Sequence, residues 1–251
     1  MDSRHRFKRA LAFALLVAAL GVLIFTAYRY VQLQQAYRIA EDVYAQMRDQ
    51  VVGSGSDAAG GGTDAVARTV DFDALTRIDP NAIAWLYGPG TPIDYPVMQA
   101  FDYAFYLTHL PDGTYNASGS LFLDYNNAPD FSDRLSVIYG HNMNNGSMFG
   151  SLPSYKQQAY FDEHPTMFLT TPQRDYRIDL LYGSVVGAGM WRDRAFMYET
   201  NLEALLAFAS ASTTFRSDVT YTDTDRFIVL STCSYEFDDA RYLVIGVLRT
   251  L

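Results

Sequence analysis

The chain contains 251 residues, of which 49% are hydrophobic and 15% aromatic, and this length is enough for one sizeable folded domain with appendages. Its formal net charge of −9 is uneven, because the first ten residues carry a net +3 and the rest of the chain carries −12. An acidic body without a basic stripe argues against nucleic-acid binding, and a single cysteine excludes an internal disulfide framework.

An apolar stretch near the N-terminus predicts a transmembrane anchor. Residues 10–27 (ALAFALLVAALGVLIFTA) are uncharged and almost wholly apolar. A membrane-spanning helix needs about 20 such residues, so we place the anchor at residues 10–28. The basic residues within 1–9 predict a cytoplasmic tail and an extracellular body. A cleaved signal peptide is the alternative, but its apolar region is usually shorter, and residues 28–30 (YRY) lack a small-residue cleavage pattern.

Two further segments separate the anchor from the folded domain. Residues 29–51 contain no Gly or Pro and carry apolar residues at helical spacing, which predicts a juxtamembrane helix. Residues 52–69 are rich in Gly and Ser and cannot form a core, so we expect a flexible linker there. The folded domain is then expected to occupy residues 70–251.

The sequence of the folded domain predicts a mainly β structure. Residues 71–78 predict a short helix that ends before Pro80. Turn-forming residues then separate a series of short runs that are rich in β-branched and aromatic residues. These runs cover residues 82–88, 95–99, 120–125, 135–140, 166–171, 176–186, 225–232 and 241–248. Many short strands without alternating long helices predict an all-β barrel or sandwich.

One amphipathic helix is expected between the sixth and seventh strands of the series, after residue 186 and before residue 225. Thr200 and Glu203 have the spacing of a capping box. A stripe of apolar residues follows at i, i+3, i+4 and i+7, namely Leu202, Leu205, Leu206 and Ala209. We expect this stripe to pack on the sheet.

The last two strands present a thiol and a guanidinium at one loop. Cys233 is the only cysteine of the chain and ends the first of these strands, and Arg241 begins the second. If the strands pair as a hairpin, these two residues become neighbours. Asp238 and Asp239, in the loop between them, are available to pair with Arg241 or to remain solvated.

His141 is the histidine with a distinctive setting, because it directly follows the strand-like run LSVIYG in a loop rich in Asn and Gly. Alone, such a residue is more often a solvated loop histidine. Together with Cys233 and Arg241, His141 would supply the side chains that an acyl-transfer reaction needs, provided that the fold brings the three together. An imidazole can take the thiol proton and return it to a leaving amine, and an arginine can stabilise the oxyanion.

At this point the chain resembles the sortases, the transpeptidases of Gram-positive cell walls, and class B fits best. The resemblance rests on LSTC followed by Arg241, on YGHNMNNGSMFGSL at 139–152, on GSLFLDYNN at 119–127, on YL at 106–107 and on DFDALTRIDPNAIAWLYGPGTPIDYPVMQ from residue 71. It covers roughly residues 70–251. The family implies an eight-stranded β-barrel with N-terminal helices and a helix in the loop between strands six and seven.

The resemblance also implies roles for individual residues. Cys233 would be the nucleophile, His141 the general acid and base, and Arg241 the donor to the oxyanion or substrate carbonyl. Ser231 and Thr232 match positions that line the peptide groove.

Two further positions concern the substrate. Leu107 matches an apolar residue of the sorting-signal pocket, although plain core packing is an equal alternative. Tyr103 stands where many class B sequences have a substrate-contacting Asn, so the first motif position is expected to be read differently here. Asp124 is expected to order a turn rather than to take part in chemistry.

The family therefore implies a membrane-anchored cysteine transpeptidase. It would cleave a C-terminal sorting signal of the Asn/Ser-Pro-x-Thr type after the threonine and transfer the secreted protein to an amine of a lipid-linked peptidoglycan precursor. Two alternatives are a pilus-assembling enzyme that uses a pilin lysine and a non-catalytic barrel that binds proline-containing peptides. We expect no cofactor and no metal, since no His/Cys cluster has ligand spacing.

Overall fold

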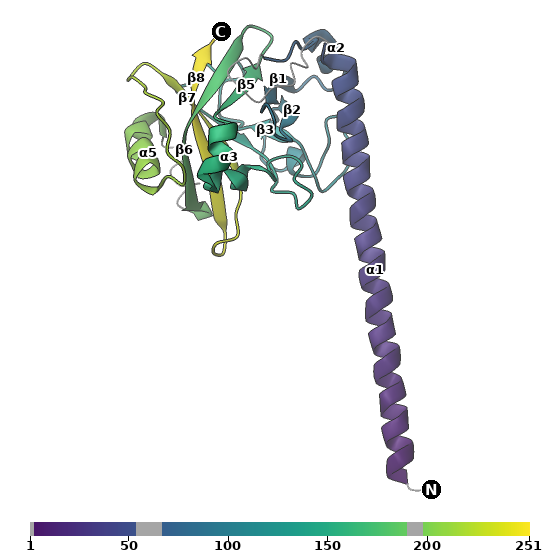
Figure 1. The fold of residues 1–251 in the computed structure, drawn as a ribbon. Coiled ribbons are helices and arrows are strands. Elements are labelled where there is room, and N and C mark those ends of the chain that lie inside the picture. The colour runs from purple at the N-terminus through teal and green to yellow at the C-terminus, as the bar shows by residue number, and fades with distance from the viewer. Residues whose placement is uncertain (1–2, 54–66, 190–197) are drawn as a thin grey trace. The chain divides into compact units, whose positions relative to one another are not determined.

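The computed structural model describes residues 3–53, 67–189 and 198–251, and the chain divides into two compact units between Glu41 and Asp42. The second unit is built on a closed eight-stranded barrel with the strand order β1-β2-β3-β4-β7-β8-β6-β5 (Figure 1). The strands are β1 Ala82–Tyr87, β2 Asp94–Met98, β3 Leu121–Leu123, β4 Leu135–Tyr139, β5 Thr166–Thr170, β6 Asp175–Gly187, β7 Arg226–Cys233 and β8 Ala240–Thr250. The predicted eight-stranded barrel is therefore confirmed.

The predicted anchor and juxtamembrane helix form one continuous helix, α1 Ser3–Val51. Its N-terminal part is long and apolar enough to cross a membrane. No Pro occurs in it and Gly21 is its only Gly, so no helix breaker separates the anchor from the juxtamembrane segment.

The C-terminal end of α1, residues 42–51, belongs to the barrel unit. Tyr44, Met47 and Val51 are buried there. Beyond the helix, Val52 pairs with Val70 in an isolated bridge, and the Gly53 N–H donates to the Thr69 carbonyl (3.0 Å). The two ends of the predicted linker are thus held together, while its residues 54–66 lie outside the described part of the chain.

The shorter helices lie between the strands. They are α2 Phe72–Ile78, η1 Phe105–Leu107, η2 Leu152–Lys156, α3 Gln158–Glu163 and α5 Tyr198–Ser212. Helix α2 confirms the predicted short helix. The Asp71 side chain accepts from the Ala74 N–H (2.9 Å) at its start, and its last residue lies two positions before Pro80.

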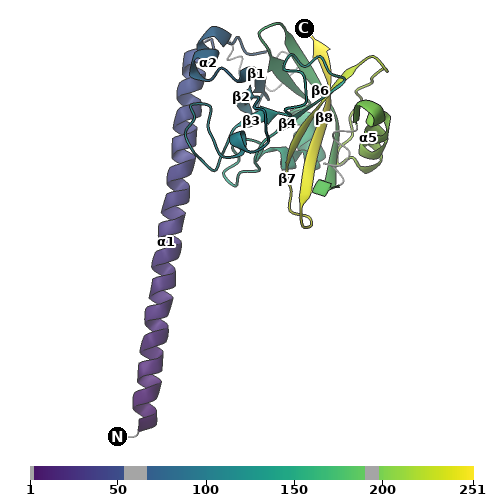
Figure 2. The same cartoon turned by 180° about the vertical axis from the view of Figure 1, so that it is seen from behind.

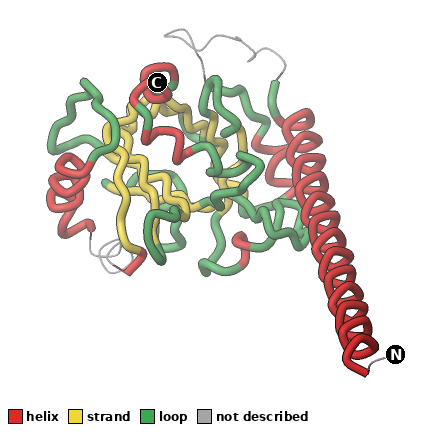
Figure 3. Tube along the Cα trace, turned by 60° about the horizontal axis from the view of Figure 1, so that its bottom comes forward, coloured by secondary structure: helices red, strands yellow, loops and turns green. Residues whose placement is uncertain are grey.

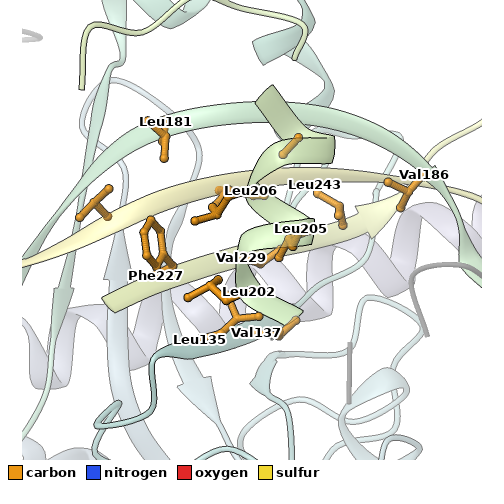
Figure 4. Packing of buried hydrophobic residues seen from close by; sticks show 13 residues of the cluster. Leu135, Val137, Leu181, Val186, Leu202, Leu205, Leu206, Phe227, Val229 and Leu243 are labelled. Atoms are coloured by element: carbon orange, nitrogen blue, oxygen red, sulfur yellow. The ribbon is translucent and has the colours of Figure 1, made fainter. Parts of the chain in front are cut away.

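Helix α5 lies on the outside of the barrel, in the connection between β6 and β7 (Figures 2 and 3). Its apolar stripe packs against residues of β4, β6, β7 and β8, as Figure 4 shows for Leu202, Leu205 and Leu206. The helix begins at Tyr198, so the predicted capping position Thr200 lies inside its first turn. Covering this outer face explains why β7 is buried at every position except its two ends.

Candidate active site

Three strand ends meet at one rim of the barrel. Strand β4 pairs in parallel with β7, with Tyr139 opposite Ser231, and β7 pairs antiparallel with β8, with Cys233 opposite Arg241. Because parallel strands end at the same edge and an antiparallel partner begins there, the end of β4, the end of β7 and the start of β8 coincide. His141 follows β4 by two residues and is therefore carried to the same rim as the thiol and the guanidinium.

Hydrogen bonds hold the loop after β4 against the end of β7. The Asn142 side chain donates from Nδ2 to the Cys233 carbonyl (2.9 Å). Thr232 Oγ1 donates to the Gly140 carbonyl (2.8 Å), and the Gly140 N–H donates to the Ser231 carbonyl (3.2 Å). These bonds fix the backbone on both sides of the thiol relative to His141. Sequence reasoning assigned no role to Asn142, although it directly follows the histidine.

The ring of His141 is oriented by a main-chain carbonyl. Its Nε2 lies 2.7 Å from the Leu107 oxygen. A carbonyl can only accept, so Nε2 carries the hydrogen in this arrangement. In the neutral ring Nδ1 is then the nitrogen that is left to accept a proton.

Arg241 keeps its charge available. Its hydrogen bond runs from an Nη atom to the carbonyl of Ala240 (2.9 Å), and it makes no ion pair within the described residues. Asp238 and Asp239 are exposed, in agreement with a solvated loop. A guanidinium without a carboxylate partner is able to stabilise a negative oxygen that develops on a bound substrate.

A second cation supports the loop between β7 and β8. Lys156 Nζ donates to Ser234 Oγ (3.0 Å), pairs with Glu236 and lies 4.9 Å from the centroid of the Tyr242 ring. These contacts hold the residue that directly follows Cys233. The lysine also helps to hold the pKa of the Glu236 carboxyl below its usual range, against the opposing effect of partial burial.

One cavity of about 490 Å³ unites the predicted site residues. Its lining contains all seven of them, together with Phe122, Tyr139, Gly140 and Ala188: Tyr103, Leu107, His141, Ser231, Thr232, Cys233 and Arg241. Leu107 is 38% exposed, so plain core packing does not describe it. Sequence reasoning did not single out Tyr139, although it is the first residue of the YGHN motif.

One wall of the cavity is supported by a buried carboxylate. Asp124 is only 3% exposed, and one of its oxygens accepts from the hydroxyls of both Tyr103 and Tyr139 (3.0 Å each). Asp124 also accepts from the Asn126 N–H (3.0 Å), so it orders the expected turn and anchors two cavity tyrosines. Burial and the neighbouring Asp124 raise the pKa of Tyr103 above its usual range.

The described residues contain no group of three or more His, Cys, Asp or Glu side chains that is arranged to hold a metal ion.

The chain is similar in sequence to known sortase B proteins. No protein-family model matches the chain. It is 28% identical to sortase B of Listeria monocytogenes over 255 aligned residues, which cover 98% of this chain and 99% of the relative. It is 23% identical to sortase B of Staphylococcus aureus, over 72% of this chain and 74% of the relative.

Solved structures agree with the sequence comparison. A Bacillus anthracis protein described as similar to sortase B superposes with a TM-score of 0.70 at 25% identity, over 86% of this chain and 98% of that chain. The Clostridium perfringens sortase B superposes with a TM-score of 0.64 at 27% identity, over 71% of this chain and 100% of that chain.

Proposed function

Because the chain belongs to the class B sortases, a family of cysteine transpeptidases, we propose that Cys233, His141 and Arg241 are its catalytic residues. The observation that carries the proposal is that these three side chains line one cavity at the rim where β4, β7 and β8 meet. Cys233 is the nucleophile, His141 the proton carrier and Arg241 the donor to the developing oxyanion.

The first step acylates the enzyme. The Cys233 thiolate attacks the carbonyl carbon of the scissile peptide bond, and the C–S bond forms while the carbonyl oxygen becomes negative. Arg241 stabilises that oxygen. The C–N bond then breaks, and the imidazolium of His141 gives its proton to the leaving amine, which yields a thioester and a neutral imidazole. With Nε2 directed at the Leu107 carbonyl, Nδ1 is the nitrogen that exchanges this proton.

The second step transfers the acyl group. An amine attacks the thioester carbon, His141 takes the amine proton, and the C–S bond breaks to restore the thiolate–imidazolium pair. The product is a new amide between the cleaved protein and the acceptor. The S. aureus sortase B, a relative of this chain, is described in complex with a substrate, and a sortase B is described in complex with triglycine. We propose by analogy that a peptide amine is the acceptor here.

The substrate is proposed to be a C-terminal sorting signal of the Asn/Ser-Pro-x-Thr type, cleaved after the threonine. Ser231 and Thr232 would line the path of the peptide beside Cys233, and Leu107 would contact its apolar part. Tyr103 would contact the first motif position. Its hydroxyl is committed to the buried Asp124, so its ring is the part that is available to a ligand.

The N-terminal helix is proposed to anchor the enzyme with residues 1–9 in the cytoplasm and the barrel outside. The apolar part of α1 and the basic residues before it support this orientation. A secreted protein that carries a sorting signal and a lipid-linked peptidoglycan amine would meet at the same membrane face. Confinement to one surface raises the effective concentration of both reactants.

The test uses the full chain in detergent micelles, because residues 42–51 pack within the barrel unit. A library of peptides varied at the first and third motif positions is incubated with the wild type, Cys233→Ala and His141→Ala, with either a glycine peptide or a lysine peptide as the acceptor. We expect cleavage, a thioester on Cys233 detected by mass spectrometry, and transfer to the glycine peptide.

Cleavage by Cys233→Ala would overturn the catalytic assignment. Peptide binding without a thioester would favour a non-catalytic peptide-binding barrel. Transfer only to the lysine peptide would favour pilus assembly over wall anchoring.

A further inference from the structure

The carbonyl that orients His141 lies outside the barrel strands. Leu107 is the last residue of η1, in the connection between β2, which ends at Met98, and β3, which begins at Leu121. A strand ladder therefore does not fix the Leu107 oxygen, although His141 Nε2 is 2.7 Å from it. Other contacts must hold this oxygen in place.

Gly119 lies beside this oxygen. Its φ is +56°, in the left-handed region. A Cβ atom at this position would lie 2.5 Å from the Tyr106 oxygen and 2.8 Å from the Leu107 oxygen. The next residue, Ser120, donates its N–H to the Tyr106 carbonyl (2.8 Å). The absence of a side chain at position 119 thus allows the backbone there to pack directly against the Leu107 carbonyl, which accepts the hydrogen bond from His141.

Gly119 is in turn hydrogen-bonded to the C-terminal end of α1. The hydroxyl of Tyr44 donates to the Gly119 carbonyl (2.7 Å) and lies 3.1 Å from Ser120 Oγ. Tyr44 is 4% exposed, and its ring contacts Tyr95 edge-on with centroids 5.0 Å apart. Burial raises the pKa of Tyr44 well above its usual range, so the hydroxyl remains a donor at all physiological pH values.

A hydrophobic cluster ties the same segment to α1 through the neighbouring residue. Tyr106 is 1% exposed and belongs to one buried cluster with Met47 and Val51 of α1. Its hydroxyl donates to Asp79 Oδ2 (2.7 Å). The cavity residues Tyr103 and Tyr139 pack against this cluster. The end of α1 therefore packs against η1 through this apolar cluster and is linked to it through the hydrogen bond to Gly119.

We propose that Gly119 and Tyr44 are positioning residues that hold the Leu107 carbonyl against His141, so that residues 42–51 of α1 are a working part of the catalytic unit. This inference rests on the role proposed for His141 above. If the carbonyl moves, Nε2 loses its acceptor and the neutral ring no longer favours the tautomer that leaves Nδ1 free. The titratable and charged side chains that share the cavity with His141 are Cys233, Arg241, Tyr103 and Tyr139.

The experiment compares two glycines of the same connection in the full chain in detergent micelles. Gly119→Ala introduces a Cβ against the Leu107 carbonyl, whereas Gly113→Ala is a matched control. Gly113 also has a positive φ, +82°, but a Cβ there would meet no heavy atom within 4 Å. We expect Gly119→Ala to lower kcat on a cleaved motif peptide roughly 100-fold, the scale of a misplaced catalytic group, and Gly113→Ala to retain activity.

A spectroscopic readout separates positioning from general destabilisation. The chain has four histidines, so the 15N NMR signals of His141 can be identified in protein labelled with 15N-histidine by comparison with His141→Ala. We expect the neutral ring to carry its hydrogen on Nε2 in the wild type and in Gly113→Ala. In Gly119→Ala we expect a mixture of the two tautomers.

Tyr44→Phe provides a second, milder perturbation that removes one hydroxyl without adding volume, and it decides the case if Gly119→Ala fails to fold. We expect kcat to fall between roughly threefold and tenfold, the range for one lost hydrogen bond. Tyr115→Phe, at a 74% exposed position of the same connection, is the control.

Wild-type tautomer and kcat in both Gly119→Ala and Tyr44→Phe, or in Tyr44→Phe alone if Gly119→Ala does not fold, would overturn the inference. Failure of the proposed function gives a different pattern, namely peptide cleavage that does not depend on Cys233, and the tautomer measurement remains decisive in that case.

Discussion

Replacing Asp124 with Asn removes one of the two oxygens that anchor the aromatic wall of the cavity and the adjoining turn, while leaving the side-chain shape almost unchanged. One carboxylate oxygen accepts from the Tyr103 and Tyr139 hydroxyls (3.0 Å each). The other accepts from Asn126 N and Nδ2 (3.0 Å each). An amide keeps only one accepting oxygen, so one of these pairs must lose its acceptor.

The expected loss of stability follows from that count. A hydrogen bond to a charged group contributes about 1.5–3 kcal/mol, and a neutral one contributes about 0.5–1.5 kcal/mol. Losing two bonds to a carboxylate that is 3% exposed, with partial compensation by the amide, predicts a decrease of about 2–4 kcal/mol in the free energy of unfolding. The weaker network around position 124 also loosens the cavity wall, so we expect KM for the motif peptide to rise more than kcat falls.

Urea unfolding of the full chain in micelles, followed by tryptophan fluorescence, measures the first effect, and steady-state cleavage measures the second. Asp130→Asn is the matched control, because Asp130 is exposed and its oxygen still accepts from the Ser132 N–H. That variant should change stability by less than about 0.5 kcal/mol. Equal unfolding midpoints and equal KM values for Asp124→Asn and the wild type would refute the anchoring role of Asp124.

Three further predictions concern the site and the fold. Arg241→Lys keeps the positive charge but loses the planar guanidinium group, and Arg241→Gln loses both. We therefore expect kcat for peptide cleavage to fall in both variants, by roughly 100-fold or more for Gln. Wild-type activity of the Gln variant would exclude an oxyanion role for Arg241. Leu205→Ala in α5 should lower the free energy of unfolding in urea by about 2–5 kcal/mol, because the side chain is 3% exposed, whereas Glu203→Ala, at an exposed position of the same helix, should have little effect. Burial raises the pKa of Tyr44, Tyr106 and Tyr242 in the folded state. Their contribution to the free energy of unfolding is therefore complete below the unfolded-state pKa of about 10 and decreases as the pH rises above it. A urea unfolding midpoint that stays constant from about pH 9 to 11 would contradict this.

Local patterns in the sequence were sufficient for the eight strands, for helices α1, α2 and α5, and for the residue types of the site, but not for the short helices η1, η2 and α3. Short β-branched and aromatic runs bounded by turn residues predicted all eight strands, because the alternation and the breakers are local properties. The apolar stripe of α5 was equally readable, and Leu202, Leu205 and Leu206 pack as expected. The sortase resemblance named Cys233, His141 and Arg241 as candidates.

The meeting of those residues depended on tertiary structure. Asn142 and Cys233, which share a hydrogen bond, are 91 residues apart in the chain, and no local signal predicts the parallel pairing of β4 with β7 that brings their loops together. The main-chain carbonyl of Leu107 carries no sequence signature at all, since every residue has one.

The contacts of α1 with the barrel unit were likewise decided only by packing. A helix without Gly or Pro after Gly21 was predictable, but its end seats Tyr44 against Gly119 because of side chains that are distant in sequence. The sequence by itself therefore determined which strands form and which candidate residues they carry. Long-range strand register and the contacts of backbone carbonyls decided where that chemistry is assembled, because both arise only when the barrel closes.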